Sequence, residues 1–252
     1  MITVNIIGAG NVATHLYKAF NKSNQVAINQ WFSRDLKCVQ DFDSETDITN
    51  DLSTLEPTDI TIIAVSDDAI AEVSKHIPYE NTLVVHTSGS VSLHELDKKH
   101  RRGVFYPLQS FSKTAEIDFS NVPICVEIDR LADVPILKKL VTVIGSPYYR
   151  INSDQRATLH LAAVFVNNFS NQLYRIAHEI TESTSVEFEI LKPLIMETAH
   201  KIESISPYMA QTGPAIRKDK RTIKKHLNAL KNPIHKDIYQ LLTKSIQKTH
   251  GR

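Results

Sequence analysis

The sequence predicts an α/β fold in which a doubly wound, mostly parallel sheet is followed by an all-α domain. The first observation behind this prediction is that short β-branched runs alternate with helical periods as far as residue 151. The second is that several of these runs are apolar throughout, as strands buried on both faces are. The third is that the strand pattern stops after Ile151. We therefore expect a sheet domain at residues 1–151 and a helical domain at residues 152–252.

Seven strands are expected in the first domain because each run is rich in residues that favour strands. They are Thr3–Ile7, Val26–Phe32, Asp59–Val65, Thr82–His86, Gly103–Tyr106, Pro123–Ile128 and Pro147–Ile151. Helices are expected between them. Asp68 is placed to cap the helix after the third strand, and Ser92 with Glu95 has the spacing of a capping box.

The second domain is expected to begin with a long helix that Ser153 or Asp154 caps and that ends near Thr181. Its segment 161–166 is apolar on every face, which is typical of a helix buried inside a molecule or between subunits. We therefore predict a homodimer formed through the helical domain. Three further helices are expected, at Glu187–Ile202, at Lys220–Leu230 with Asp219 as its cap, and at Ile234–Lys248.

Composition excludes several classes of protein. The 252 residues are 42% hydrophobic and 23% charged, with a formal net charge of +1, as in an ordinary folded domain. The two cysteines have neither the number nor the spacing of a disulfide or zinc framework, so no metal is expected. No apolar run reaches the ~20 residues of a membrane helix. The chain enters its first strand without a basic leader, so a cytoplasmic location and no membrane partner are expected.

A glycine-rich loop follows the first strand and opens a helix. Gly8 and Gly10 with Ala13 form the pattern GxGxxA, and Asn11 and Val12 begin the helix. Glycines at these places allow a tight turn and let a pyrophosphate approach the backbone, while the helix N-terminus offers free N–H groups to phosphate. The pattern alone is weak, but its place between strand and helix predicts a Rossmann domain that binds a dinucleotide.

The end of the second strand predicts which dinucleotide is bound. NAD sites place an acid there, whereas this chain has Ser33 and Arg34. A hydroxyl and a guanidinium suit a 2′-phosphate, so NADP(H) is preferred over NAD(H). The neighbouring Asp35 keeps NAD possible if the strand ends later. Arg34 has the alternative interpretation of an exposed loop arginine.

The carboxyl ends of the third and fourth strands should border the same crevice. Val65 and Ser66 are expected to contact the cofactor, and His86 and Ser88 the substrate. His86 is alternatively an imidazole at the edge of the sheet whose hydrogen bonds are satisfied within the protein. The segment around Ser88 and Gly89 is alternatively a simple turn.

These residues resemble a known family. The loop from Gly8 and the segments 64–70, 86–90, 106–111, 159–169 and 212–227 are similar to NADP-dependent oxidoreductases that join a Rossmann-like domain to a helical domain of unknown function. The resemblance covers essentially the whole chain. More distantly, the chain resembles pyrroline-5-carboxylate reductase and the 3-hydroxyisobutyrate and 6-phosphogluconate dehydrogenases. The resemblance implies a helical domain similar to the C-terminal domain of 6-phosphogluconate dehydrogenase, and it adds Gln109 to the expected substrate contacts. It implies no particular substrate.

One departure from the wider group concerns the catalytic residues. The resemblance implies a lysine one helical turn before an asparagine, but before Asn167 this chain has Ala163 and Val164. At about 100° per residue, His160 shares a helical stripe with Asn167. We expect His160 to act as general acid or base and Asn167 to hold the substrate oxygen. Alternatively, His160 is a structural residue at a domain interface.

A basic run lies at residues 217–225. It has no interleaved aromatic residues, so a solvated helix start is favoured and no nucleic-acid partner is expected. Arg217 is expected to reach the substrate, where it would favour an anion.

The sequence thus predicts an NADP(H)-dependent oxidoreductase that acts on a small metabolite by hydride transfer. The missing lysine favours an alternative, a non-catalytic NADP(H)-binding protein that senses redox state or regulates a partner. A methyltransferase that binds S-adenosylmethionine would need an acid at the position of Ser33 and Arg34.

Overall fold

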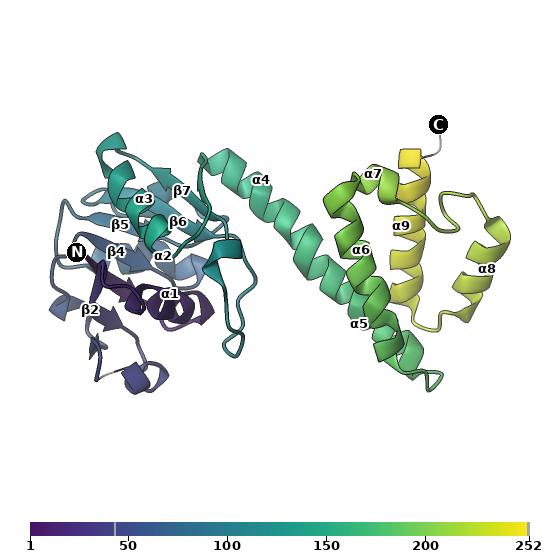
Figure 1. The fold of residues 1–252 in the computed structure, drawn as a ribbon, viewed down its shortest axis with the longest axis horizontal. Coiled ribbons are helices and arrows are strands. Elements are labelled where there is room, and N and C mark those ends of the chain that lie inside the picture. The colour runs from purple at the N-terminus through teal and green to yellow at the C-terminus, as the bar shows by residue number, and fades with distance from the viewer. Residues whose placement is uncertain (43, 251–252) are drawn as a thin grey trace. The chain divides into compact units, whose positions relative to one another are not determined.

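The computed structural model describes residues 1–42 and 44–250. The chain divides into two compact units, one spanning Met1–Asn167 and the other beginning at Asn168. The first unit holds a β-sheet and the helices around it, and the described part of the second unit holds helices and loops (Figure 1). The last strand ends at Arg150, close to the expected domain boundary, but the helix that follows it groups with the sheet.

One eight-stranded sheet forms the centre of the first unit, in the order β3-β2-β1-β4-β5-β6-β7-β8. Neighbouring strands are parallel except β6 and β7, which are antiparallel. The predicted doubly wound, mostly parallel sheet is therefore confirmed. The strands are β1 Ile2–Ile7, β2 Val26–Phe32, β3 Asp47–Thr49, β4 Ile60–Ile63, β5 Leu83–His86, β6 Arg101–Pro107, β7 Ile124–Ile128 and β8 Tyr148–Arg150.

All seven predicted strands are present, and β3 is the strand that the sequence did not predict. It has three residues at the edge of the sheet and pairs only with β2. Its single aliphatic residue, Ile48, gives no apolar run that a sequence pattern could detect.

Alternate residues of the central strands enter two separate hydrophobic clusters, as a sheet covered on both faces requires. Ile6 and Val85 belong to the cluster that contains Leu16 of α1 and Leu140 of α3. Their chain neighbours Ile7 and Val84 belong to the other cluster, with Ile70 of α2. Figure 1 shows these helices around the sheet. The helices of the first unit are α1 Asn11–Asn21, α2 Ile70–His76, α3 Val134–Val143 and α4 Ser153–Ala163.

Two expected helix starts differ from the structure. Asp68 does not cap α2, because it lies inside a 3-10 turn, Asp67–Ala69, and Ala69 takes the N-cap position. Ser92 accepts a hydrogen bond from the His94 N–H at 3.2 Å, but the turn it caps ends at Glu95. In both places a 3-10 turn forms where a side-chain cap was expected to start an α-helix.

The long helix of the second half starts one residue earlier than expected. Asn152 accepts a hydrogen bond from the Gln155 N–H at 2.8 Å, and Gln155 accepts one from the Asn152 N–H at 3.0 Å. This reciprocal pair is a capping box. After α4 the helix widens into a π-helical turn at Val164–Phe169, which leads into α5 at Ser170–Glu182.

The remaining helices follow the predicted order. They are α6 Lys192–Ser204, α7 Pro207–Ala210, α8 Lys220–Ala229 and α9 Pro233–His250. Asp219 caps α8 as predicted, accepting from the Thr222 N–H at 3.0 Å. Pro193 lies in the first turn of α6, where its missing N–H costs no hydrogen bond. The short helix α7 was not predicted. Among the described residues, no helix has the length and apolar character needed to cross a bilayer.

Candidate functional site

The glycine loop after β1 is fixed by contacts that require glycine at its first position. Gly8 has φ +116°, and a Cβ built on it would lie 2.2 Å from the carbonyl oxygen of Ala64. The Gly8 carbonyl accepts a hydrogen bond from the Trp31 indole at 2.6 Å, and its N–H donates to the Phe32 carbonyl at 2.9 Å. These contacts fix the path of the loop at Gly8.

The N-terminus of α1 is free to receive an anion. Gly10 is the N-cap residue and provides no side-chain cap, and no acidic residue occupies the first turn. A Cβ on Gly10 would meet no atom within 4 Å, so this residue faces open space. The first N–H groups of α1 and the positive end of its dipole are thus available to phosphate. Asn11 is tied down elsewhere, since its amide donates to the Phe111 carbonyl at 2.7 Å.

A cavity of about 630 Å³ opens above this loop, a volume typical of small-molecule sites. It lies where the strand order reverses between β1 and β4, the usual place for a ligand in a doubly wound sheet. The structure brings together here all the residues that the sequence assigned to the cofactor, namely Gly8, Gly10, Asn11, Val12, Ser33, Arg34, Val65 and Ser66. Gln109 also lines the cavity, with Asp35, Cys38, Thr87 and Phe111.

The end of β2 shapes one side of this cavity. The strand ends at Phe32, so Ser33 and Arg34 are the first residues beyond it. Asp35 caps the next 3-10 turn, and its carboxylate accepts from the Lys37 N–H at 3.1 Å. Arg34 is exposed and makes no hydrogen bond or ion pair to the described part of the chain.

His86 and Ser88 do not line the cavity. His86 is fully buried, and its Nδ1 accepts from the Ser88 N–H at 3.2 Å. Burial, and secondly the nearby Arg156 guanidinium, lower the pKa of His86 to about 4. Ser88 is buried too, and its hydroxyl accepts from the N–H groups of Ser90 and Val91 at 3.1 Å each. In this structure both side chains shape the loop after β5.

His160 lies against that same loop. Its Nδ1 is 3.2 Å from the hydroxyl of Tyr106, which stands near the carboxyl end of β6. A Cβ on Gly89 would lie 2.6 Å from the same nitrogen, so His160 packs directly on the Gly89 backbone. Gly89 follows Thr87 by two residues, and Thr87 lines the cavity. His160 therefore stands beside the loop that borders the candidate cofactor site.

Two residues in this region were missed by the sequence analysis. Tyr106 was expected only as the last residue of a strand, although its place at a strand end before Pro107 could have marked it as a site residue. Arg156 is 1% exposed and gives a charge-assisted hydrogen bond to the Glu127 carboxylate at 2.9 Å. Arg156 lies one helical turn before His160, but nothing in the sequence says that it is buried.

The structure interrupts the regular helix on which the expected stripe of His160 and Asn167 was based. That alignment assumed a regular helix, but the π-helical turn at Val164–Phe169 changes the angle between successive residues. Asn167 lies inside this turn and is exposed. Arg217 is exposed in the second unit, on the loop before α8.

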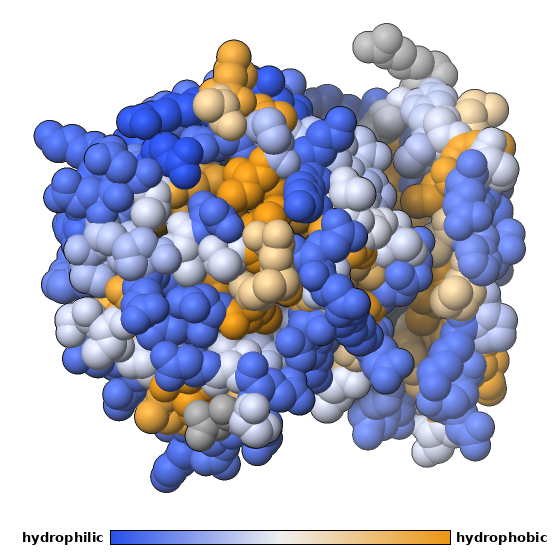
Figure 2. Space-filling view, turned by 60° about the vertical axis from the view of Figure 1, so that its left-hand side comes forward, coloured by the Kyte–Doolittle hydropathy of each residue, from blue (hydrophilic) through white to orange (hydrophobic). Residues whose placement is uncertain are grey.

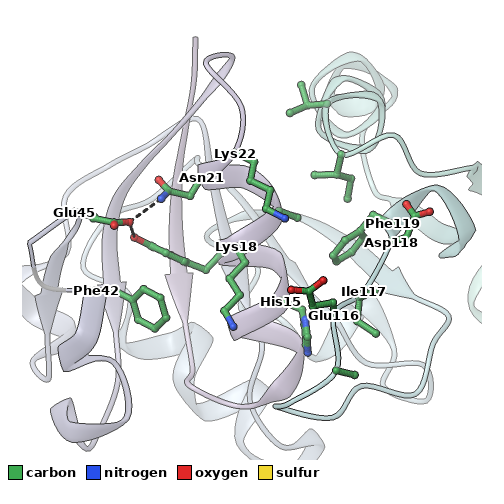
Figure 3. A pocket seen from close by; sticks show the side chains of 15 residues that line it. His15, Lys18, Asn21, Lys22, Phe42, Glu45, Glu116, Ile117, Asp118 and Phe119 are labelled. Atoms are coloured by element: carbon green, nitrogen blue, oxygen red, sulfur yellow. Dashed lines mark hydrogen bonds between the residues drawn. The ribbon is translucent and has the colours of Figure 1, made fainter.

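A second and larger cavity lies along α1, between this helix and the segment 115–119 (Figure 3). Lys18 and Lys22 line it together with three carboxylates, so it has no dominant charge. Glu45 is hydrogen-bonded to Asn21 at 2.8 Å. Asp118 is held by the N–H and hydroxyl of Ser120, which lower the pKa of its carboxyl group. None of the predicted site residues lines this cavity.

The fold and the cavity at the glycine loop place this protein in the class of Rossmann-type dehydrogenases that have a second, helical unit. A solved structure narrows the class further. The "putative NADP oxidoreductase" from Bacteroides fragilis is 37% identical over 100% of this chain and 98% of its own, with a TM-score of 0.89. The chain belongs to the same family as that protein, which confirms the resemblance described above.

More distant structures share the fold alone. The imine reductase from Myxococcus stipitatus, solved with NADP⁺, has a TM-score of 0.70 and 15% identity over 98% of this chain and 93% of its own. The pyrroline carboxylate reductase from Plasmodium falciparum, solved with NADP, has a TM-score of 0.63 and 11% identity over 99% and 98%. Residues 122–246 match a family described as a domain of unknown function, DUF2520. No curated protein matches the chain.

Proposed function

We propose that this protein is an NADP(H)-dependent oxidoreductase that transfers hydride between the nicotinamide ring and a small metabolite. The observation that carries the proposal is the cavity above β1 and β4, where a preformed glycine loop and a free helix N-terminus meet Ser33 and Arg34. The name of the Bacteroides fragilis relative supports the same activity.

The residues present fit the cofactor. A Cβ at Gly8 would collide with the backbone, and Gly10 leaves space for a pyrophosphate beside the first turn of α1. Ser33 and Arg34 would hold the 2′-phosphate, because Arg34 has no partner among the described residues and Asp35 is engaged in its turn. NADP(H) is therefore the preferred cofactor. When bound, it supplies the hydride, and the protein supplies position and proton transfer.

His160 is the proposed proton-transfer group. It packs on Gly89 in the loop after β5, and its Nδ1 lies 3.2 Å from the Tyr106 hydroxyl. An imidazole can give or take the proton that must accompany hydride transfer to a carbonyl or imine carbon. Asn167 and Arg217 remain proposed substrate contacts, as does Gln109, which lines the cavity.

A spectrophotometric assay tests this function. NADPH and NADH are titrated separately, and absorbance at ~340 nm then follows NADPH oxidation by imines and 2-oxo acids, and NADP⁺ reduction by 3-hydroxy acids. We expect tighter binding of NADPH and turnover with one panel. Tight NADPH binding with no turnover in any panel would instead favour a non-catalytic NADP(H)-binding sensor. Failure to bind either dinucleotide would overturn the proposal.

We also propose that the protein forms a homodimer through its helices. Leu161 of α4 and Val166 of the π-helical turn are 60% and 74% exposed, and Met196 and Leu241 are more than half exposed. Figure 2 shows hydrophobic residues exposed among polar ones on this face of the molecule. Large apolar side chains exposed to this extent mark a protein interface. Light scattering should give twice the chain mass, and a stable monomer at micromolar concentration would contradict the proposal.

A further inference from the structure

The His160 ring packs closely against residues from two other parts of the chain. The Tyr106 hydroxyl lies 3.2 Å from Nδ1, and the two rings meet edge to face with centroids 6.1 Å apart. On another side the Gly89 backbone is so near that a methyl group there would lie 2.6 Å from Nδ1 and 2.9 Å from Cγ. One ring nitrogen is thus engaged, and the other, Nε2, makes no hydrogen bond to the described residues.

The Tyr106 hydroxyl is suited to fix the ring rather than to react. Burial raises the pKa of Tyr106, the Cys125 thiol adds to this rise, and Arg156 opposes it. The phenol therefore keeps its proton near neutral pH and can donate it to Nδ1 of a neutral imidazole. In that arrangement the imidazole proton must sit on Nε2.

The Gly89 backbone is itself held in place by Arg156. One guanidinium nitrogen donates to the carbonyls of Ser88 at 3.1 Å and Val91 at 2.7 Å, on either side of Gly89. The other donates to the Glu127 carboxylate at 2.9 Å, which anchors the guanidinium to β7. Because Arg156 and His160 lie one turn apart on α4, the same helix sets both the loop and the imidazole.

We propose that Tyr106, Gly89 and Arg156 are positioning residues that hold His160 in the Nε2–H tautomer, so that Nε2 is the atom that exchanges a proton with the substrate. This inference rests on the proposed function. Tyr106 sets the tautomer, Gly89 leaves the space that the ring occupies, and Arg156 fixes the loop that contains Gly89.

The tautomer can be measured without turnover. In protein labelled with ¹⁵N-histidine, the imidazole nitrogen shifts show which ring atom carries the proton, and a His160→Gln variant assigns the signal among the 11 histidines. We expect the wild-type protein to show only the Nε2–H form of neutral His160. Tyr106→Phe should give a mixture of tautomers. The control is Tyr148→Phe, because the Tyr148 hydroxyl is buried without a hydrogen-bond partner in the described structure. That control should leave the His160 signal unchanged.

Kinetics test the consequence for proton transfer. Tyr106→Phe should lower kcat about 2- to 12-fold, the equivalent of one neutral hydrogen bond, and should leave the Kd of NADPH unchanged. Gly89→Ala should lower kcat about tenfold or more, because the added methyl displaces the ring. Arg156→Lys keeps the positive charge, but one ammonium group cannot reach the carbonyls of Ser88 and Val91 and the Glu127 carboxylate together. This variant should therefore also show a mixture of His160 tautomers. Arg102→Lys, at the ion pair with Asp129, is its matched control.

The outcomes separate this inference from the proposed function. A wild-type His160 with its proton on Nδ1, or a Tyr106→Phe variant with unchanged tautomer and kcat, would overturn the positioning role even if the enzyme turns over NADPH. If no substrate is found, the proposed activity fails on its own assay, while the tautomer measurement still decides whether Tyr106 sets the ring. If Gly89→Ala does not fold, Tyr106→Phe decides alone.

Discussion

The glycine loop and the surroundings of His160 lie in the same unit but are built in different ways. The loop at residues 8–13 takes its shape from one short segment between β1 and α1, supported by the neighbouring strand at Trp31. The surroundings of His160 combine its own contacts with residues 89 and 106 and the bonds that Arg156 makes to the loop at residue 88 and to Glu127. A local motif fixes the backbone that receives phosphate, whereas a long-range assembly fixes one reactive side chain. The two regions should therefore respond to substitution in separable ways.

The largest expected effect is on turnover, and it tests whether His160 belongs to chemistry rather than to folding. His160→Asn should lower the rate about 10²–10⁴-fold, the usual contribution of a general acid or base. The affinity for NADPH and the melting temperature should stay near the wild-type values, because the glycine loop does not depend on His160. A variant that melts far below the wild type yet keeps its specific activity would make His160 a structural residue.

The second effect concerns the stability of the loop after β5. The pKa of His86 is about 4 in the folded protein and ~6.5 in the unfolded chain, so the unfolded chain binds more protons between these values. The free energy of unfolding should therefore fall as the pH drops from about 6.5 to 4, by up to about 3 kcal/mol from this residue.

Urea unfolding of the wild type and of His86→Asn at pH ~7 and ~4.5 isolates this contribution, since carboxylates titrate equally in both. Asparagine can still accept the Ser88 N–H, so the comparison leaves that hydrogen bond in place. An identical loss of stability in both proteins would mean that His86 is already free to protonate in the folded state.

The third prediction concerns the cofactor cavity alone. Arg34→Ala should weaken NADPH binding by about 1.5–3 kcal/mol, as expected for a hydrogen bond to a charged group, and should barely change NADH binding. Lys37→Ala is a suitable control, because Lys37 is a neighbouring exposed cation that does not line the cavity. Equal losses for both dinucleotides, or tighter binding of NADH by the wild type, would contradict the NADP preference.

The smallest effect tests the start of the helix that presents His160. Asn152→Ala removes one half of the capping box and should reduce the free energy of unfolding by about 1 kcal/mol. Asn152→Asp should retain most of this stability, because a carboxylate also accepts from the Gln155 N–H and suits the helix N-terminus. Chemical denaturation measures both variants. Equal destabilisation by alanine and aspartate would exclude the cap as the cause.

The same contrast explains what could be predicted from the sequence. Seven of the eight strands and the residues that line the cavity at the glycine loop were predicted because apolar runs, glycine spacing and strand ends are local signals. The short strand β3 and the 3-10 turns at Asp67–Ala69 and Leu93–Glu95 carry weak or misleading local signals. The role of Arg156 could not be predicted, because its partners lie 29 to 68 positions away. The π-helical turn left no pattern that we could detect.

The direction of strands β7 and β8 explains how His160 comes to lie beside Tyr106. These two strands run opposite to β1–β6, so α4, which leaves the far end of β8, travels back toward the edge where β6 ends. Along β6, the step from Val104, which pairs with Glu127, to Tyr106 spans about 6.6 Å. Along α4, the step from Arg156 to His160 spans about 6 Å. The spacing along the strand therefore matches the spacing along the helix. Deletion of any one residue between Arg156 and His160 would allow only one of two contacts to form, either Arg156 with Glu127 or His160 with Tyr106.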